Sequence, residues 1–420
     1  MELVDPLTAV IISFVFLGAM LYRRVALGMT LNLTAFLLAL LSLEWGGIPN
    51  IVYASLNPLT LGGRLTISVL LATFGIMWLS QLYKETSFIK DLSESLSRLI
   101  RNSKVVLSML PAVVGLLPVA GGALMSAPIV DAEAEKLGMK TERKAYVNMW
   151  FRHLIFPVYP LSQVLIITAA LTGTTTASVI LRQIPVVAVM IIAGYALSFW
   201  KISSVKNVNT NTGENHRGSS LRVFLKAFSP IMATIIVAIC LDLVNYDLSR
   251  QGVDVLLATI AGLTVLAAIS KANFRVLINP LRNRSVYDIT LAAFGAFLLR
   301  NVMEASGISE VFKPIVANGN INVTLLLATI PTVFGFLTGS PSGGVAIGTS
   351  ILAGILTFSP KAAALVYIMA YLGYVISPTH LCFTFTVDYF KTSLVKVYKY
   401  LIPSFLTTFA SALLMYLMPF

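Results

Sequence analysis

An apolar segment rich in glycine and proline occurs twice in this chain, at residues 115–128 (GLLPVAGGALMSAP) and 335–351 (GFLTGSPSGGVAIGTSI). Glycine and proline interrupt a regular helix, so neither segment is expected to form one straight apolar helix. The double glycine of the first segment recurs 222 positions later in the second, and Pro157 recurs as Pro378 after 221 positions. One register therefore relates the two halves of the chain.

The composition identifies the medium in which the chain folds. Hydrophobic residues make up 57% of the 420 positions, charged residues make up 11%, and the mean hydropathy is +0.85, which excludes a soluble domain. The hydrocarbon core of a bilayer takes about 20 apolar residues per helix. Apolar stretches of that length predict an all-α polytopic membrane protein with ten transmembrane helices, at about 5–22, 25–43, 60–82, 146–171, 176–199, 223–243, 253–270, 286–305, 361–380 and 400–418.

The net charge of +12 is carried mostly by loops. Six basic loops hold 22 of the 30 Lys and Arg residues, near 23–24, 84–104, 136–144, 201–222, 271–284 and 391–399. This placement excludes a nucleic-acid partner, and the positive-inside rule places these loops in the cytoplasm. Glu2 and Asp5 precede the first apolar run and arginines follow it, so we expect an anchor and not a cleaved signal peptide. The sequence predicts a multi-pass protein of the cell membrane, surrounded by the lipid bilayer, with both termini outside.

Two further apolar stretches, at about 105–128 and 321–358, are interrupted by glycines and prolines. A full crossing at either one would place later basic loops on the wrong side, so we predict re-entrant hairpins, the first entering from the cytoplasm and the second from outside. Each half then has five spans and one hairpin. Because five is odd, the second half begins on the opposite side of the membrane from the first and has the inverted orientation. The predicted organisation is a first inverted repeat at 1–205, a cytoplasmic linker at 206–221 and a second inverted repeat at 222–420.

The two predicted hairpin tips are candidate binding sites. Non-helical backbone inside a membrane is tolerated only within protein or beside water or ligand. Helix N-termini at such tips suit anions, and unwound carbonyls suit a cation such as Na⁺. An alternative is that these small residues only allow close helix packing. The candidate tip residues are Gly121, Gly122, Ser126, Ser340, Ser342, Gly343, Gly344 and Thr349.

The span after each hairpin is also interrupted, around Pro157 in the first half and around Pro378 in the second. Proline frees a backbone carbonyl one turn earlier, which can face an ion or a substrate. Tyr159 and Thr379 add hydroxyl groups. Arg152 and His153 are placed to contact an anionic group, and His380 to carry a coupling proton. Arg152 snorkelling to the cytoplasmic surface, and histidines that only bond the freed carbonyls, are the alternatives.

Other classes of protein are less favoured by the sequence. Cys240 and Cys382 are isolated in apolar stretches, so neither a disulfide framework nor a fixed metal site is expected, and no cofactor beyond a coupling Na⁺ or H⁺. The segment Ser340-Pro-Ser342-Gly343 lacks the leading glycine of an intramembrane serine protease, and no paired aspartate motif is found. We therefore do not expect an enzyme. A channel would conduct without coupling or saturation.

The plan of inverted halves, each with a hairpin and then a broken helix, resembles the ion transporter superfamily, which includes citrate, dicarboxylate and gluconate permeases, arsenite transporters and sodium/proton antiporters. Residues 151–161 (FRHLIFPVYPL) and 377–383 (SPTHLCF) resemble an uncharacterised prokaryotic integral-membrane family placed in it. The resemblance implies secondary active transport, site residues at the tips and breaks, and the homodimers common in that superfamily. Neither tip has the Ser-Asn-Thr motif of dicarboxylate carriers, so a dicarboxylate substrate is not implied.

These observations predict a secondary active transporter that moves a small organic anion, coupled to H⁺ or Na⁺, by alternating access. Arg152 and His153 supply positive charge, whereas buried carboxylates are scarce. The alternative is a cation/proton antiporter of the same superfamily, which would need a carboxylate near the middle of the membrane. A channel or an intramembrane protease is less favoured.

Overall fold

The computed structural model describes residues 4–100, 102–117, 122–202, 214–244, 247–248, 251–308, 310 and 322–419. Its described secondary structure is helical throughout. The first half contains α1 (Pro6–Tyr22), α2 (Leu27–Ser42), η1 (Trp45–Gly47), α3 (Ile48–Leu56), α4 (Leu61–Glu85), α5 (Phe88–Leu99), α6 (Ser103–Gly115), α7 (Gly122–Glu135), α8 (Thr141–Arg152), η2 (Phe156–Val158), α9 (Gln163–Thr172) and α10 (Thr176–Phe199). The second half contains α11 (Glu214–Val244), α13 (Val253–Ser270), α14 (Phe274–Ile278), η3 (Asn279–Arg282), α15 (Arg284–Ala305), α17 (Val323–Thr338), α18 (Pro341–Ala353), α19 (Pro360–Ile376), α20 (Leu381–Tyr389) and α21 (Leu394–Leu417).

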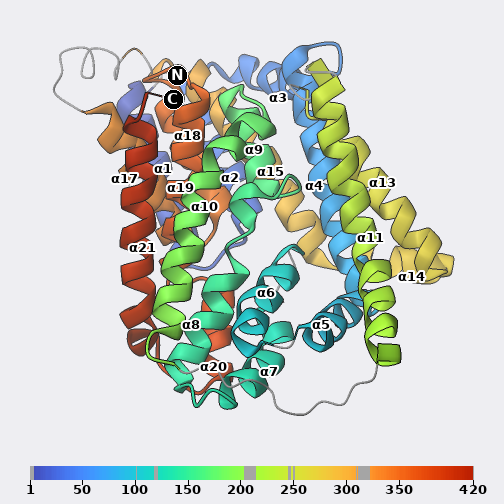
Figure 1. Ribbon diagram of the computed structural model, residues 1–420. Helices are drawn as coiled ribbons and strands as arrows, with labels where there is room; N and C mark the ends of the chain where they lie inside the picture. The colour runs from blue at the N-terminus through green and yellow to red at the C-terminus, as the bar shows by residue number, and fades with distance from the viewer. Residues whose placement is uncertain are drawn as a thin grey trace.

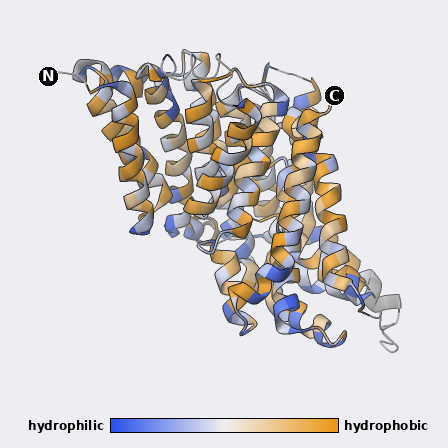
Figure 2. Cartoon of the chain, turned by 90° about the vertical axis from the view of Figure 1, so that its left-hand side faces the viewer, coloured by the Kyte–Doolittle hydropathy of each residue, from blue (hydrophilic) through white to orange (hydrophobic). Residues whose placement is uncertain are grey.

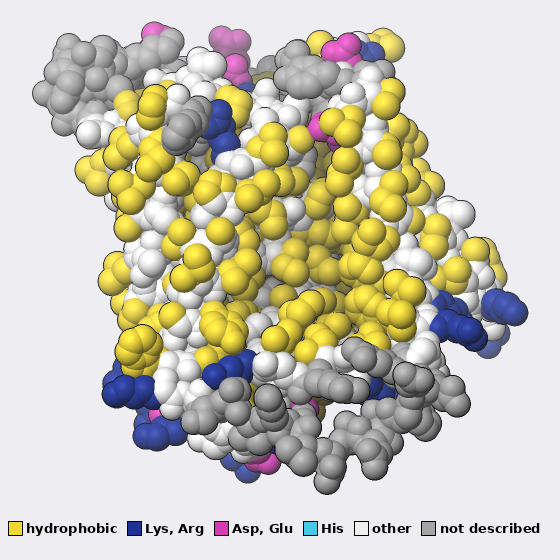
Figure 3. All heavy atoms as spheres, in the orientation of Figure 1, with side chains coloured by type: hydrophobic (Ala, Val, Ile, Leu, Met, Phe, Trp, Pro, Cys, Tyr) yellow, Lys and Arg dark blue, Asp and Glu magenta, His cyan; other side chains and the backbone are white. Residues whose placement is uncertain are grey.

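Most of these helices suit a membrane. In the described part of the chain, eight helical segments are long and apolar enough to cross one, and α1 and α2 are apolar but shorter, at 17 and 16 residues. Hydrophobic residues follow the upright helices in Figure 2, and hydrophilic residues gather at their ends. On the face shown in Figure 3, most of the visible Lys and Arg lie toward the lower edge. The chain is therefore an all-α polytopic membrane protein, and the count of ten spans stays a prediction.

The two interrupted spans lie at the centre of the molecule. The segment formed by α19 and α20 is 78% buried over its most apolar window, and the segment from α8 to α9 is 72% buried. The corresponding fractions for α10, α11, α13 and α21 are only 22–33%. The continuous helices α4 and α15 are intermediate, at 67% and 56%. The helices with broken backbone are thus the most enclosed by protein, because lipid cannot satisfy their free N–H and C=O groups.

The two halves of the sequence interlock and do not form separate bodies. Helix α4 of the first half packs against α13 and α15 of the second, and α2 also packs against α15. Figure 1 shows α4, α11 and α13 side by side at one flank. The beginning of α1 and the end of α21 lie at the same end of the molecule in this view, as an even number of crossings would require.

Both interrupted apolar stretches form helical hairpins, in which α6 packs against α7 and α17 packs against α18. Figure 1 shows α6 and α7 in the lower half of the molecule and α18 in the upper half. The first hairpin continues beyond the predicted end at Pro128, because this proline lies inside α7 on an exposed face. The stretch predicted as a linker is also partly helical, since α11 begins at Glu214; an apolar helix extends through polar residues at a cost of only a few tenths of a kcal/mol each.

Candidate functional site

The first break, between α8 and α9, is stabilised by the other half of the chain. The turn η2 contains Pro157, whose ring nitrogen cannot donate a hydrogen bond. Tyr371 of α19 donates to the carbonyl of His153 over 2.7 Å. Tyr367 of the same helix donates to the carbonyl of Phe156 over 3.1 Å. Backbone acceptors at the first break are therefore satisfied by phenol groups of the second half.

The second break, between α19 and α20, is shorter and is held by its own hydroxyl groups and by a tyrosine of α21. Ser377 donates to the carbonyl of Phe336 in α17 over 2.6 Å. The backbone N–H of Thr379 donates to the Ser377 hydroxyl over 3.2 Å, and Tyr398 donates to the carbonyl of Ile376 over 2.8 Å. This break is thereby attached to the second hairpin.

The tip of the second hairpin touches the second break. Helix α17 ends at Gly339, which has a φ of +59°, a conformation that favours glycine. A methyl group on Gly339 would collide with Thr379, so the close approach also requires glycine. Next to it, the Ser340 and Ser342 hydroxyls lie 3.2 Å apart at the start of α18.

Arg152 is enclosed by the first hairpin. Its side chain is 2% exposed, and Nη2 donates to the carbonyl of Leu117 over 3.3 Å. A methyl group on Gly122 would collide with Nη2, and one on Gly115 would collide with the Arg152 carbonyl. Nη1 is buried without a hydrogen-bond partner among the described residues. The structure thus places Arg152 inside the protein, and the snorkelling alternative is wrong.

A cavity of about 320 Å³ lies where the two breaks and the second hairpin tip meet. It brings together five of the residues singled out from the sequence, Arg152, His153, Ser340, Ser342 and His380. Its other polar lining residues are Ser162, Gln163, Ser285, Asp288, Tyr371, Tyr374 and Cys382.

The cavity has a buried end and an exposed end. Arg152, His153 and His380 are each 2% exposed or less. Asp288 and Leu381, which also line the cavity, are exposed. A solute entering at the exposed end would therefore meet the arginine and the two histidines at the buried end.

The two histidines face each other at the buried end. The rings of His153 and His380 are nearly perpendicular, with centroids 4.8 Å apart. His153 Nδ1 lies 2.6 Å from the carbonyl of Met149, and its Nε2 lies 3.3 Å from the Tyr374 hydroxyl. The alternative in which a histidine bonds a freed carbonyl holds for His153. His380 lies near the carbonyl of Val375, but neither of its ring nitrogens has a well-aligned hydrogen bond with a described residue.

Several predicted tip residues lie away from this cavity. Ser126 donates to Asn148 over 2.6 Å, between α7 and α8. Thr349 donates to Val345 within its own helix and is fully buried. Gly343 lies against Thr338, and Gly344 packs against α17 and α19, so these two glycines allow close packing, as the alternative interpretation held. These residues were predicted because they are close to the hairpin tips in sequence. In the structure they face other sides of their helices and do not line the cavity.

The remaining predicted residues also do not line the cavity. Pro157 and Tyr159 are buried in the first break, and Pro378 and Thr379 are exposed at the second. Pro157 and Pro378 create the breaks without contacting the space between them, and Thr379 supports the hairpin tip. Gly121 lies outside the described residues.

Sequence reasoning missed two tyrosines that line the cavity and one buried polar residue outside it. Asn148 is fully buried and donates to the carbonyl of Ala123 over 2.9 Å and to Thr386 over 3.3 Å, which joins α7, α8 and α20 without lining the cavity. An amide one helical turn before Arg152 in an apolar span was the signal that could have identified it. Tyr371 and Tyr374 gave no comparable signal, because aromatic residues are ordinary in apolar helices.

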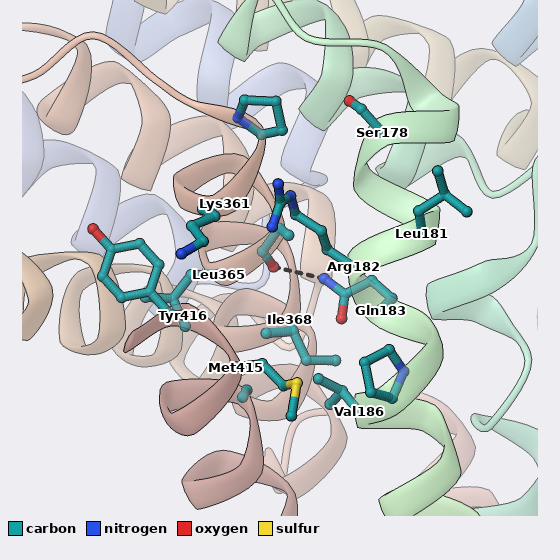
Figure 4. A pocket seen from close by; sticks show the side chains of 14 residues that line it. Ser178, Leu181, Arg182, Gln183, Val186, Lys361, Leu365, Ile368, Met415 and Tyr416 are labelled. Atoms are coloured by element: carbon teal, nitrogen blue, oxygen red, sulfur yellow. Dashed lines mark hydrogen bonds between the residues drawn. The ribbon is translucent and has the colours of Figure 1, made fainter. Parts of the chain in front are cut away.

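A second and larger cavity, of about 660 Å³, lies between α10, α19 and α21. Figure 4 shows Arg182 and Lys361 beside an otherwise largely apolar lining, and Gln183 donating to the Ala364 carbonyl over 2.7 Å. No residue of either hairpin or either break lines it. We therefore assign the candidate site to the smaller, central cavity.

Comparisons with known proteins identify a family for this chain. No curated protein matches it. One family model matches residues 7–418, which is nearly the whole chain. The chain therefore belongs to the family described as Protein of unknown function (DUF401).

Proposed function

We propose that this protein is a secondary active transporter that moves a small organic anion, coupled to H⁺ or Na⁺, by alternating access. The observation that carries the proposal is the central cavity, because Arg152, His153 and His380 come together there with the Ser340 and Ser342 hydroxyls. These groups derive from two helix breaks and one hairpin tip in opposite halves of the chain. A relative movement of the halves would therefore change the site directly.

The polar groups of the cavity suit an anion. The guanidinium of Arg152 is buried and keeps one nitrogen without a partner among the described residues, and a carboxylate is its natural acceptor. The first residues of α18, Ser340 to Ser342, line the same space, so the positive end of that helix dipole contributes. The volume of about 320 Å³ suits a small solute.

We further propose that the halves are inverted repeats. An offset of 221 positions aligns α6 with α17, α8 with α19 and α10 with α21. Helix contacts form matched pairs under this alignment: α6 with α8 and α17 with α19, α7 with α20 and α18 with α9, α8 with α21 and α19 with α10. The chain runs down α1 and up α11 in Figure 1. This pairing supports two copies of one unit in opposite orientation.

The exposed end of the cavity suggests which way the site faces. Ser285 and Asp288 lie within the first turns of α15, directly after the basic loop that the sequence places in the cytoplasm. We therefore propose that the cavity opens to the cytoplasm in this conformation, in a protein of the cell membrane with both termini outside.

One observation favours the alternative of a cation/proton antiporter. Asp288 is the carboxylate among the described lining residues, and such a group can exchange protons for cations. It is exposed, whereas Arg152 and the two histidines are buried, so it favours this function less than Arg152 favours anion transport.

The test is thermal unfolding of the purified full-length protein with carboxylates, sugar acids and oxyanions, in Na⁺ or K⁺, at two pH values. A bound anion at 100 times its dissociation constant should stabilise the protein by about 2.7 kcal/mol. Arg152→Met should abolish this stabilisation. Arg182→Met, which changes a cation in the other cavity, should retain it.

Two results would contradict the proposal. No stabilisation by any anion, together with a shift caused by Na⁺ or pH alone, would favour the antiporter. Equal anion responses in Arg152→Met and the native protein would remove Arg152 from the site. Uptake into proteoliposomes then decides whether an anion that binds is also transported.

A further inference from the structure

Three side chains at the buried end of the cavity form a cluster of metal-ligating atoms. One ligand atom each from His153, His380 and Cys382 lie within 4.8 Å of one another. The whole chain has only three histidines and two cysteines. Two of those histidines and one of those cysteines therefore meet at one point, from helix breaks in opposite halves.

His153 is held in the form that a metal ligand requires. Its Nδ1 lies 2.6 Å from the Met149 carbonyl, which can only accept, so Nδ1 carries the proton. Nε2 is then the acceptor atom, and it lies 3.3 Å from the Tyr374 hydroxyl, which a metal ion would displace from it. A backbone carbonyl that orients the far nitrogen is the usual outer-sphere partner of a metal-bound histidine.

His380 lacks the partners that a buried imidazole normally has. Its side chain is 1% exposed, and neither ring nitrogen forms a hydrogen bond with any described residue. The carbonyl of Val375 lies near the ring and can accept from one nitrogen at most. Buried polar atoms of proteins are nearly always paired, so a ring with at least one unpaired nitrogen in a cavity is suited to a ligand.

We propose that His153, His380 and Cys382 bind a thiophilic transition metal ion of the Zn²⁺ class, whose open fourth position accepts the transported anion. The part of this proposal in which the transported anion binds at the open position rests on the proposed function. Zinc takes nitrogen and sulfur ligands tetrahedrally, and functional sites use three protein ligands and one exchangeable position. Tetrahedral zinc ligands lie about 3.5 Å apart, so the cluster would contract slightly on binding.

The charge around the cluster favours an anion as the fourth ligand. Arg152 lies at the same end of the cavity and would repel a bare dication. Metal binding deprotonates the Cys382 thiol, and the thiolate offsets one positive charge. An anion shared by the metal and the guanidinium would offset more. The substrate class that follows is an anion able to coordinate a metal, such as a carboxylate or an oxyanion.

The experiment uses Zn²⁺ and its spectroscopic substitute Co²⁺ with the full-length protein in detergent. We expect one bound ion per chain by equilibrium dialysis, and with Co²⁺ a sulfur-to-metal charge-transfer band in the near ultraviolet. Cys382→Ser should abolish that band and weaken binding on the order of 100-fold. Cys240→Ser is the matched control, because the other cysteine is exposed on α11, and it should leave both unchanged.

A second measurement keeps Cys382 in place, so that it still tests the metal site if Cys382→Ser fails to fold. In the Cys240→Ser background, Zn²⁺ should protect Cys382 from a maleimide reagent, and His380→Asn should remove the protection.

Absent metal binding, or a Co²⁺ band that survives in Cys382→Ser, would overturn the metal site. An unchanged Co²⁺ spectrum at anion concentrations that stabilise the protein would overturn the fourth-ligand role. Failure of the transport proposal would be distinguishable from failure of the metal site, because the metal would still bind while no anion stabilised the protein.

Discussion

The two helix breaks occupy corresponding positions in the two halves, yet they supply different chemistry. The first contributes the charge of Arg152 and the ring of His153, and 221 positions later the second half has Gly373 and Tyr374. The second break contributes His380, where the first has Tyr159, and lies against the hairpin tip that bears Ser340. The difference teaches that one site is assembled from unequal halves, and that neither half holds it alone.

Packing differs between the halves at these positions. In the second half, α17 presses directly on Gly373, where a methyl group would collide with the Thr332 carbonyl. In the first half, Gly115 allows a similar close contact with the Arg152 carbonyl, and Gly122 leaves the space that the Arg152 guanidinium fills. Both halves therefore use glycine for close backbone contact, and the first half in addition buries a cation against its hairpin.

The largest expected effect comes from filling the space around Arg152. Gly122→Val should displace the guanidinium, abolish anion-dependent stabilisation and transport, and destabilise the protein by about 3 kcal/mol through overpacking. Gly18→Val is the control, because no atom lies near that position. Thermal unfolding and uptake measure both effects. An unchanged anion response in Gly122→Val would show that the first half contributes no charge to the site.

The next largest effect is expected from disturbing the contact between the tip of the second hairpin and the second break. Gly339→Ala should cost about 2 kcal/mol, since alanine disfavours a φ of +59° and its methyl group would collide with Thr379. Gly138→Ala carries the conformational penalty alone, about 1 kcal/mol, because its φ is +61° and its surroundings are open. Equal losses of stability in denaturant titrations of the two variants would show that the tip does not depend on this contact.

Tyr371→Phe should weaken the first break by about 1 kcal/mol, because the carbonyl of His153 would lose its donor in a buried place. The same change at Tyr398, whose hydroxyl serves the second break and is only partly buried, should cost less. Tyr22, which is 87% exposed, serves as the reference with no expected effect. A larger loss in Tyr398→Phe than in Tyr371→Phe would contradict the expectation that the more buried of these two hydrogen bonds contributes more to stability.

The smallest perturbation is chemical labelling, which should leave stability unchanged. Cys382 lines the cavity and is partly exposed, so in a Cys240→Ser background a membrane-impermeant maleimide should label it from the cytoplasmic side. A substrate anion should slow the labelling. Labelling only from outside would mean that the cavity opens in the opposite direction, and the proposed orientation would fail.

Much of the backbone plan could be predicted from the sequence because local residues encode it. Proline at 157 and at 378 lies at the two breaks, and glycine at 339 permits the turn of a hairpin tip. The predicted ends were less accurate, because Pro128 lies inside a helix, as do the buried Pro111 and Pro331. The helical start of α11 was missed because polar residues extend a helix without an apolar pattern.

The side chains of the site could be predicted only in part. Arg152, His153 and His380 were found because charged and ionisable groups in a membrane are costly and so indicate function. Ser126 and Thr349 were chosen for their hydroxyls, but both point to partners within or between helices. Their direction depends on the rotation of each helix about its own axis, which neighbouring helices set.

The sequence by itself determined the membrane medium, the two interrupted hairpins, the two broken spans and the register between the halves. Composition and the local effects of proline, glycine and charge suffice for these, because they act within a few residues. Only the tertiary structure decided that Cys382 lies beside His153, and that Tyr374 reaches a histidine 221 positions away. Such contacts depend on how two enclosed helices pack against each other, and packing joins residues that no local pattern connects.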